Sequence, residues 1–244
     1  MSASAITGVN VGEAVRKSAS NMPGYGPSDV YYPPAWAGLF TIRRQVTRDT
    51  GTDLTLTYKF RLLPTIDVNN QAAAVQDRGY NQANLEAALR GAVIDDNDGS
   101  SLAGTAVRSY TWSANNPNDV SVELADNSVK SIKVTKRAAD STAETVSSSE
   151  FQRVSQVSAA TGIPVVTARR VLTKYKAATP IDNQNDAVTT IEGLEIVYDM
   201  GGGGDPMSAT TATALSTDKP RVLSKSRLLL ERLTLSAEPA TTVL

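Results

Sequence analysis

Apolar and polar residues alternate along most of the chain from Gly38 onward. The clearest run spans residues 54–62, where leucines and aromatic residues alternate with Thr, Lys and Arg, and Phe40, Ile42 and Val46 repeat the pattern upstream. A period of two indicates a strand with one buried and one solvated face. The same reasoning predicts further strands over residues 102–112, 120–124, 129–134, 151–157, 164–175, 189–198 and 221–235.

These segments amount to about eight or nine strands, separated by turns rather than by helices that would make parallel crossovers. Asp126 and Asn127 stand between two alternating segments and predict a tight hairpin turn. The sequence therefore predicts an all-β fold, a single antiparallel barrel whose closure hides the strand edges. One short helix is predicted over residues 83–92, with Leu85, Ala88 and Leu89 on one apolar stripe, and we expect it to cover one end of the barrel.

Proline, glycine and tyrosine are frequent in residues 23–34, which excludes a long helix or a central strand there. We interpret residues 1–35 as an extended N-terminal arm, residues 36–238 as the barrel domain, with long loops near 95–104 and 201–220, and residues 239–244 as a tail. The arm either binds a partner or lies on its own domain. Its candidate partner-contact residues are Tyr25, Tyr31, Tyr32, Pro33 and Pro34. Trp36, directly before the first strand, is expected to plug one end of the barrel.

Composition removes most catalytic and metal chemistry. The 244 residues include no Cys and no His, so disulfides, thiolate nucleophiles, Ser-His-Asp triads and the usual zinc and haem ligands are excluded. We therefore expect no enzyme, no catalytic residue, no metal and no cofactor. Carboxylate chemistry is the remaining enzymatic alternative, and it requires two acids that converge in a cleft. With 24 Lys and Arg against 25 Asp and Glu, the net charge of -1 also disfavours nucleic acid as a partner.

Three polar motifs have simple interpretations as loops or solvated strand residues. Four glycines, residues 201–204, precede Asp205 and Pro206 and so do not form a phosphate-binding loop. The aspartates of residues 95–98 lack the Glu that a calcium-binding loop requires. Glu192, Glu195 and Asp199 are spaced irregularly along one predicted strand, so they need not share a face.

Two pairs of adjacent arginines, Arg43-Arg44 and Arg169-Arg170, lie on predicted strands, and each pair places one arginine on either strand face. Arg169 is the candidate inward-facing member of its pair, because it shares a face with Val165, Val171 and Tyr175. An inward arginine requires an ion pair with Asp or Glu, or an anionic ligand. The ion pair is the simpler interpretation, and binding of an anionic head group is the alternative.

Several short segments occur together in one order: Tyr31-Tyr32-Pro33-Pro34-Ala35-Trp36, Val75-Gln76-Asp77-Arg78-Gly79-Tyr80-Asn81, Asn115-Asn116-Pro117-Asn118, Ser149-Glu150-Phe151-Gln152, the 167–175 strand and the 191–198 strand. In this order they resemble a family of uncharacterised proteins of cyanobacteria and of the chloroplast thylakoid lumen. The resemblance covers about residues 30–235, and Phe40 stands where many members have Trp. It implies a lipocalin-like or calycin-like barrel and a lumenal location, and it implies no catalytic residues.

We expect one of two roles from this resemblance. The first is a non-catalytic thylakoid-lumen protein that docks peripherally on photosystem I or II, or its antenna, as an extrinsic structural, stabilising or assembly subunit. The second is a soluble carrier of a lipid, carotenoid or other apolar molecule inside the barrel. A filled interior would contradict the carrier, whereas an open pocket of several hundred cubic ångströms would favour it.

Overall fold

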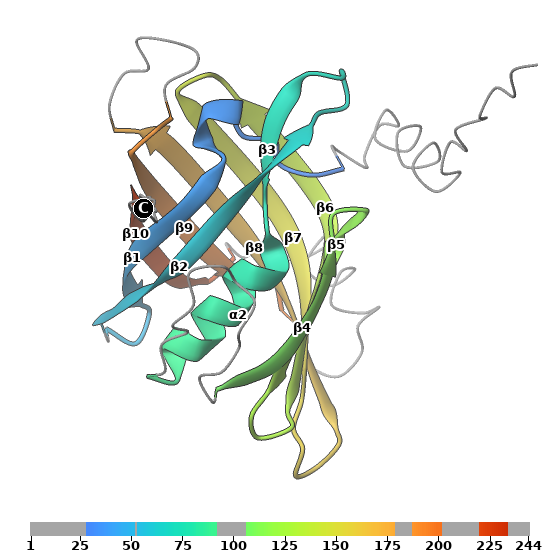
Figure 1. Ribbon diagram of the computed structural model, residues 1–244. Helices are drawn as coiled ribbons and strands as arrows, with labels where there is room; N and C mark the ends of the chain where they lie inside the picture. The colour runs from blue at the N-terminus through green and yellow to red at the C-terminus, as the bar shows by residue number, and fades with distance from the viewer. Residues whose placement is uncertain (1–27, 52, 92–105, 179–186, 202–219, 234–244) are drawn as a thin grey trace, which may run out of the picture.

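The computed structural model of the chain describes residues 28–51, 53–91, 106–178, 187–201 and 220–233 (Figure 1). Tyr25, the expected loop at residues 95–104, most of the loop at 201–220 and the tail from residue 239 lie outside the described residues. The aspartates of residues 95–98 and the last three of the four consecutive glycines do so as well.

Ten strands make up most of the described chain, so the prediction of an all-β fold is confirmed and the predicted number of strands was slightly low. The strands are β1 (Gly38–Arg48), β2 (Asp53–Ile66), β3 (Ala72–Gln76), β4 (Val107–Ser113), β5 (Asn116–Leu124), β6 (Val129–Ser141), β7 (Thr145–Val157), β8 (Pro164–Ala177), β9 (Thr190–Asp199) and β10 (Val222–Arg232). Two helices accompany them: the single-turn η1 (Pro34–Trp36) and α2 (Arg78–Leu89).

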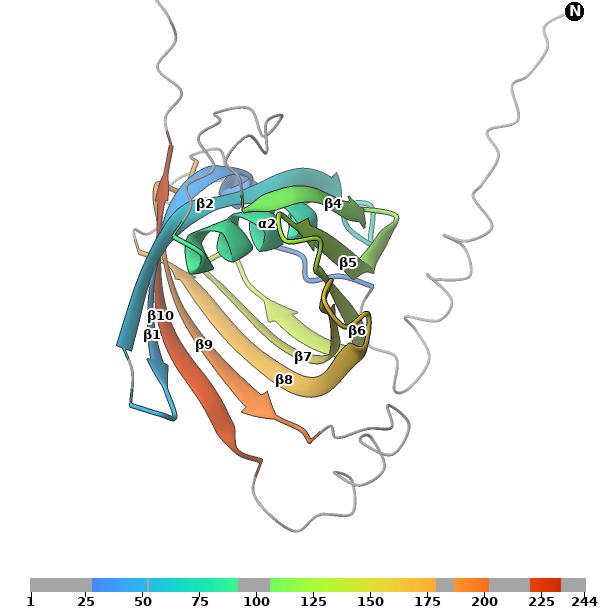
Figure 2. The ribbon, with the colours of Figure 1, turned by 90° about the horizontal axis from the view of Figure 1, so that it is seen from below.

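All ten strands form one antiparallel sheet in the order β3-β2-β1-β10-β9-β8-β7-β6-β5-β4. Strands β4 to β10 follow one another as hairpins, and the predicted turn at Asp126-Asn127, with Asn127 at φ 61°, joins β5 to β6. Pairing of β1 with β10 then brings the first three strands beside the last one. The sheet curls around a central space, as Figure 2 shows, but β3 and β4 remain its two edges and do not pair.

Helix α2 completes the wall where the sheet does not close. It contacts β2 on one side and β4 and β5 on the other, so it does not cover an end of the barrel as predicted (Figures 1 and 2). It begins at Arg78, five residues before the predicted start, because the Asp77 side chain accepts a hydrogen bond from the Tyr80 backbone N–H and caps it. Ala83 and Ala87 pack against β4 and β5. Small side chains, rather than the predicted leucine stripe, therefore face the sheet.

The larger hydrophobic core lies at one end of the curled sheet. It combines inward residues of β1, β2, β9 and β10 with residues of the segment before β1, among them Trp36, which is fully buried. Tyr32 and Ala74 exchange two backbone hydrogen bonds of 2.8 Å, and these attach this segment to the outer edge of β3. Residues 30–36 therefore close this end of the barrel, as expected of Trp36.

Candidate ligand-binding cavity

A cavity of about 610 Å³ occupies the curled sheet beyond the core. Part of its lining is apolar and comes from β1, β2 and β10, with Ile42, Leu56 and Leu228 as examples. Leu85 and Leu89 of α2, the leucines of the predicted stripe, also line it. Since these leucines face the cavity and not the sheet, the helix presents a second apolar surface to the interior.

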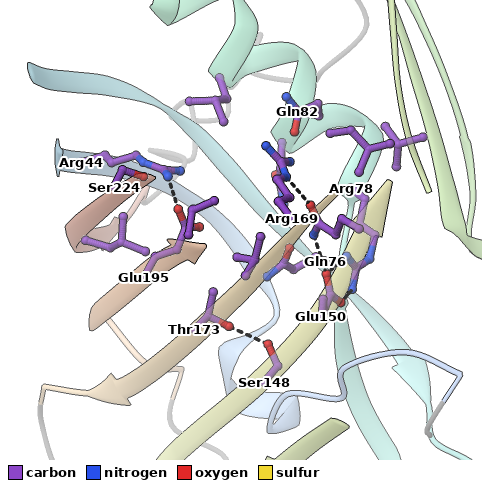
Figure 3. A pocket seen from close by; sticks show the side chains of 18 of the residues that line it. Arg44, Gln76, Arg78, Gln82, Ser148, Glu150, Arg169, Thr173, Glu195 and Ser224 are labelled. Atoms are coloured by element: carbon purple, nitrogen blue, oxygen red, sulfur yellow. Dashed lines mark hydrogen bonds and ion pairs between the residues drawn. The ribbon is translucent and has the colours of Figure 1, made fainter. Parts of the chain in front are cut away.

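The lining contributed by β7 is polar, and that of β8 contains both polar and apolar residues. Ser148, Glu150 and Gln152 alternate on the inward face of β7, and on β8 Thr173 lies opposite Ser148 and Arg169 opposite Gln152. Figure 3 shows Ser148, Glu150, Thr173 and Arg169. The Ser148 and Thr173 hydroxyl oxygens are 2.6 Å apart and share a hydrogen bond. We call the five residues Ser148, Glu150, Gln152, Arg169 and Thr173 the polar strip. It lies in the same cavity as the apolar lining, so the cavity is amphipathic.

Arg44 and Glu195 form an ion pair that connects β1 to β9 across the intervening strand β10. Both side chains are largely buried. Burial by itself would lower the pKa of Arg44, but the Glu195 carboxylate beside it raises the pKa above its ordinary value. Arg43, the other arginine of this pair, is exposed, so the prediction that one member of the pair points inward is confirmed.

Four charged side chains meet around Glu150, in the middle of the polar strip. Arg78 Nη2 lies 2.8 Å from both Asp29 Oδ1 and Glu150 Oε1, and Arg137 Nε lies 2.7 Å from Glu150 Oε1. Burial alone would raise the pKa of Glu150, but the two guanidinium groups hold it well below its usual range. Two cations and two anions balance in this buried cluster, which ties the segment before β1 to the barrel.

Arg169 lines the cavity and has a different environment from Arg44. Its Nε donates a hydrogen bond of 2.9 Å to Gln152 Oε1, and no carboxylate in the described part of the chain lies within 4.0 Å of its guanidinium nitrogens. Burial lowers the pKa of Arg169 below its ordinary value. The interpretation of Arg169 as a partner in an ion pair is therefore wrong for the described residues, and the alternative of an anionic ligand remains.

Arg170 lies on the outer face of β8. Its Nε donates to Ser149 Oγ at 3.0 Å, and its guanidinium carbon is 5.3 Å from the centre of the Phe151 ring. At this level of the barrel, β7 and β8 therefore place polar side chains inside and an aromatic ring outside. This arrangement reverses the usual placement of apolar residues inside and polar residues outside. Its signal in the sequence is the alternation of Ser148, Glu150 and Gln152 with Phe151. A rule that always places aromatic residues inside does not detect it.

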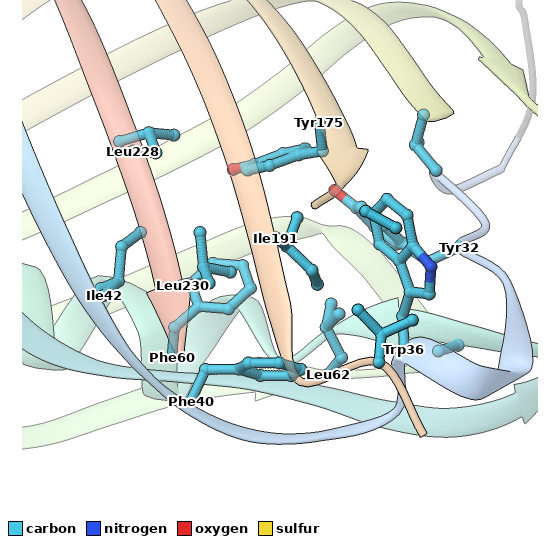
Figure 4. Packing of buried hydrophobic residues seen from close by; sticks show 14 of the residues in the cluster. Tyr32, Trp36, Phe40, Ile42, Phe60, Leu62, Tyr175, Ile191, Leu228 and Leu230 are labelled. Carbon is cyan, nitrogen blue, oxygen red and sulfur yellow. The ribbon is translucent and has the colours of Figure 1, made fainter. Parts of the chain in front are cut away.

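The candidate partner-contact residues divide between core and surface. Tyr32 is buried among the aromatic residues of the core, with its ring centre 6.0 Å from that of Tyr175 (Figure 4). Tyr31 is half-buried, and its hydroxyl is 3.1 Å from Ser28 Oγ. Pro33 is half-buried and Pro34 is exposed. Tyr32 is thus a structural residue of the barrel, and from residue 28 onward the arm lies on its own domain.

The carboxylates predicted on one strand do not form a site. Glu195 faces the cavity and pairs with Arg44, Asp199 lines the cavity farther along β9, and Glu192 is exposed on the other face. Within the described ranges no three carboxylates gather closely enough to hold a metal ion. Within the same ranges no helix has the length and apolar character needed to cross a membrane.

The sheet, helix α2 and the cavity lining all lie between residues 28 and 233. No curated protein matches the chain, and no solved structure matches it. The model of one protein family does match, over residues 24–234, and thus covers every strand of the sheet. That family is described as a domain of unknown function, DUF6816, and the chain belongs to it.

Proposed function

We propose that this protein is a non-catalytic binding protein that holds one small amphipathic molecule inside the curled sheet. The observation that carries the proposal is the cavity of about 610 Å³, which has both an apolar lining and the polar strip. Pockets for small ligands usually measure about 300–1,000 Å³ and combine apolar walls with a few convergent polar groups. Of the two roles expected from the sequence, the carrier is the one that needs such an interior.

The state of the carboxylates in the cavity supports binding rather than catalysis. A general acid at neutral pH needs a raised pKa. Glu150 instead has a lowered pKa. Burial alone would raise this pKa, but Arg78 and Arg137 stabilise the ionised carboxylate by more than burial destabilises it. Glu195 is paired with Arg44. Both carboxylates thus have structural partners, and neither resembles a proton donor for hydrolysis.

A fluorescence titration with the neutral apolar dye N-phenyl-1-naphthylamine tests the proposal. We expect the purified protein to bind the dye with a blue shift and enhanced emission. Val197 lines the cavity on β9, so Val197→Trp fills the space with an indole ring and should weaken dye binding by about tenfold or more. Leu194→Trp is the matched control, because Leu194 is on the same strand and is exposed on its outer face.

The two variants separate binding in the cavity from binding on the surface. Equal dye affinity in wild type and Val197→Trp would place the dye outside the cavity and contradict the proposal. The absence of any dye binding by the wild-type protein would contradict it as well.

A further inference from the structure

We infer that the bound molecule carries one carboxylate group and that Arg169 binds this group at the polar strip. The inference rests on the proposed function and assigns the chemical class of the ligand. It follows from the pairing of charges in the cavity, from the orientation of the Arg169 guanidinium and from the apolar side chains beside it.

Charge pairing singles out Arg169. Three other cations of the cavity lining in the described residues are buried or half-buried, and each has a carboxylate partner. The pairs are Arg44 with Glu195, Arg78 with Glu150, and Lys130 with Glu86. Arg48, at the end of β1, is exposed and thus solvated. Arg169 is a half-buried cation whose side-chain partner is a neutral amide. A guanidinium in such a place is stabilised by an anion that enters the cavity.

Asp199 is the nearest alternative partner by strand register, because it lies directly opposite Arg169 on β9. Its Oδ1 accepts a hydrogen bond of 2.9 Å from the Gly201 backbone N–H. The two side chains do not form an ion pair. The protein therefore leaves the positive charge of Arg169 available on the cavity side of β8.

The hydrogen bonds of Gln152 orient this charge. Gln152 accepts from Arg169 Nε and, through its own Nε2, donates to Glu150 Oε2 at 2.9 Å. Glu150 is fixed in turn by the buried cluster of four charges. With Nε engaged, the two Nη groups of Arg169 remain as a planar fork, which matches the two oxygens of a carboxylate. Gln152 is thus a positioning residue for Arg169.

Apolar residues flank this fork. Val134 lies on β6 opposite Gln152, and Val171 follows Arg169 on the same face of β8. A ligand whose carboxylate contacts Arg169 therefore places its adjoining carbon chain against apolar side chains. A single available guanidinium balances one negative charge, so the class that fits is a monocarboxylate with an apolar body, such as a fatty acid.

Competition between two matched ligands tests this inference at neutral pH. Laurate and 1-dodecanol have the same chain length and differ in the charged head group. We expect laurate to displace N-phenyl-1-naphthylamine from the wild-type protein at a concentration about tenfold or more below that needed for 1-dodecanol. In Arg169→Met the two competitors should become equally effective while the dye still binds.

Arg170→Met is the matched control, because it removes the same charge one residue away on the outer face of β8. It should keep the wild-type preference for laurate. Equal displacement by laurate and 1-dodecanol in the wild-type protein, or an unchanged preference in Arg169→Met, would overturn the assignment of the carboxylate and leave the carrier function in place. A wild-type protein that binds no dye would instead overturn the proposed function. The wild-type comparison requires no variant to fold.

Discussion

Arg44 and Arg169 have the same side chain and both face the cavity, but their surroundings give them opposite effects on stability. Arg44 has the Glu195 carboxylate beside it, whereas Arg169 has the neutral Gln152. Removing one partner of a largely buried ion pair leaves the other charge uncompensated. An unpaired cation that is partly removed from water lowers the free energy of unfolding, so its removal should not destabilise the protein. We therefore expect Arg169 to serve binding rather than stability.

We predict from this difference that Arg44→Met lowers the free energy of unfolding by about 3 kcal/mol, because Glu195 loses its cation. Arg169→Met should leave it within about 0.5 kcal/mol of the wild-type value or raise it. Gln152 keeps its hydrogen bond to Glu150 in that variant. Unfolding in urea, followed by tryptophan fluorescence, measures both values. A large loss of stability in Arg169→Met would mean that Arg169 is a structural residue.

Helix α2 forms the wall of the cavity where the sheet does not close. It joins β2 to β4 and β5 and supplies Leu85 and Leu89 to the cavity lining. Gly79, in its first turn, permits close contact with β4: a Cβ atom there would lie 2.5 Å from Tyr110 Cδ2 and 2.8 Å from Trp112 Cβ. The predicted stripe of Leu85, Ala88 and Leu89 did not indicate this contact, because the residue that makes it possible has no side chain.

The substitution Gly79→Ala tests how the helix docks. In an isolated helix this change would add about 1 kcal/mol of stability. Here the new methyl group overlaps the Tyr110 ring and the Trp112 side chain, so we expect a net loss of about 1–3 kcal/mol in the free energy of unfolding. Denaturant unfolding measures it. In a Tyr110→Ala background the same substitution should cost less, and an equal cost in both backgrounds would contradict the proposed contact.

At the scale of the whole molecule, the core and the cavity adjoin inside the same curled sheet and share residues such as Ile42 and Leu228. The segment from Val30 to Trp36 and the aromatic residues of β1 and β2 fill one end, so burial there stabilises the fold. The remaining interior holds the cavity and the polar strip. Gln152 and Arg169 are not core residues, so their variants can be studied without loss of the core, whereas Glu150 also belongs to the buried cluster of four charges.

Location in the thylakoid lumen, and docking on a photosystem, remain predictions that depend on the sequence resemblance. If the protein is a carrier, we expect most of it to migrate as a free protein when thylakoids are solubilised in mild detergent and separated under native conditions. Mass spectrometry of the separated bands measures this. Stoichiometric migration with photosystem I or photosystem II would instead support the role of an extrinsic subunit and identify the partner.

Much of the sheet could be predicted because strand alternation is a local signal. The burial of Leu56, Phe60 and Leu62 between less buried neighbours follows from the sequence directly. Two segments gave no such signal. In β3 the run Ala73–Val75 is buried at every position, since residues 30–36 cover its outer side. In the first half of β7, Ser148 and Glu150 face the polar part of the cavity, so apolar alternation is absent.

The amino-acid sequence by itself determined the fold class, the hairpin turn at Asp126-Asn127 and the exclusion of chemistry that needs His or Cys. These properties depend on composition or on neighbours a few residues apart. The tertiary structure decided which charges are paired. Arg44 meets Glu195 across 151 positions of sequence, whereas Arg169 meets an amide, because strand order and register bring distant residues together. No local pattern encodes that register, and the candidate binding site depends on it.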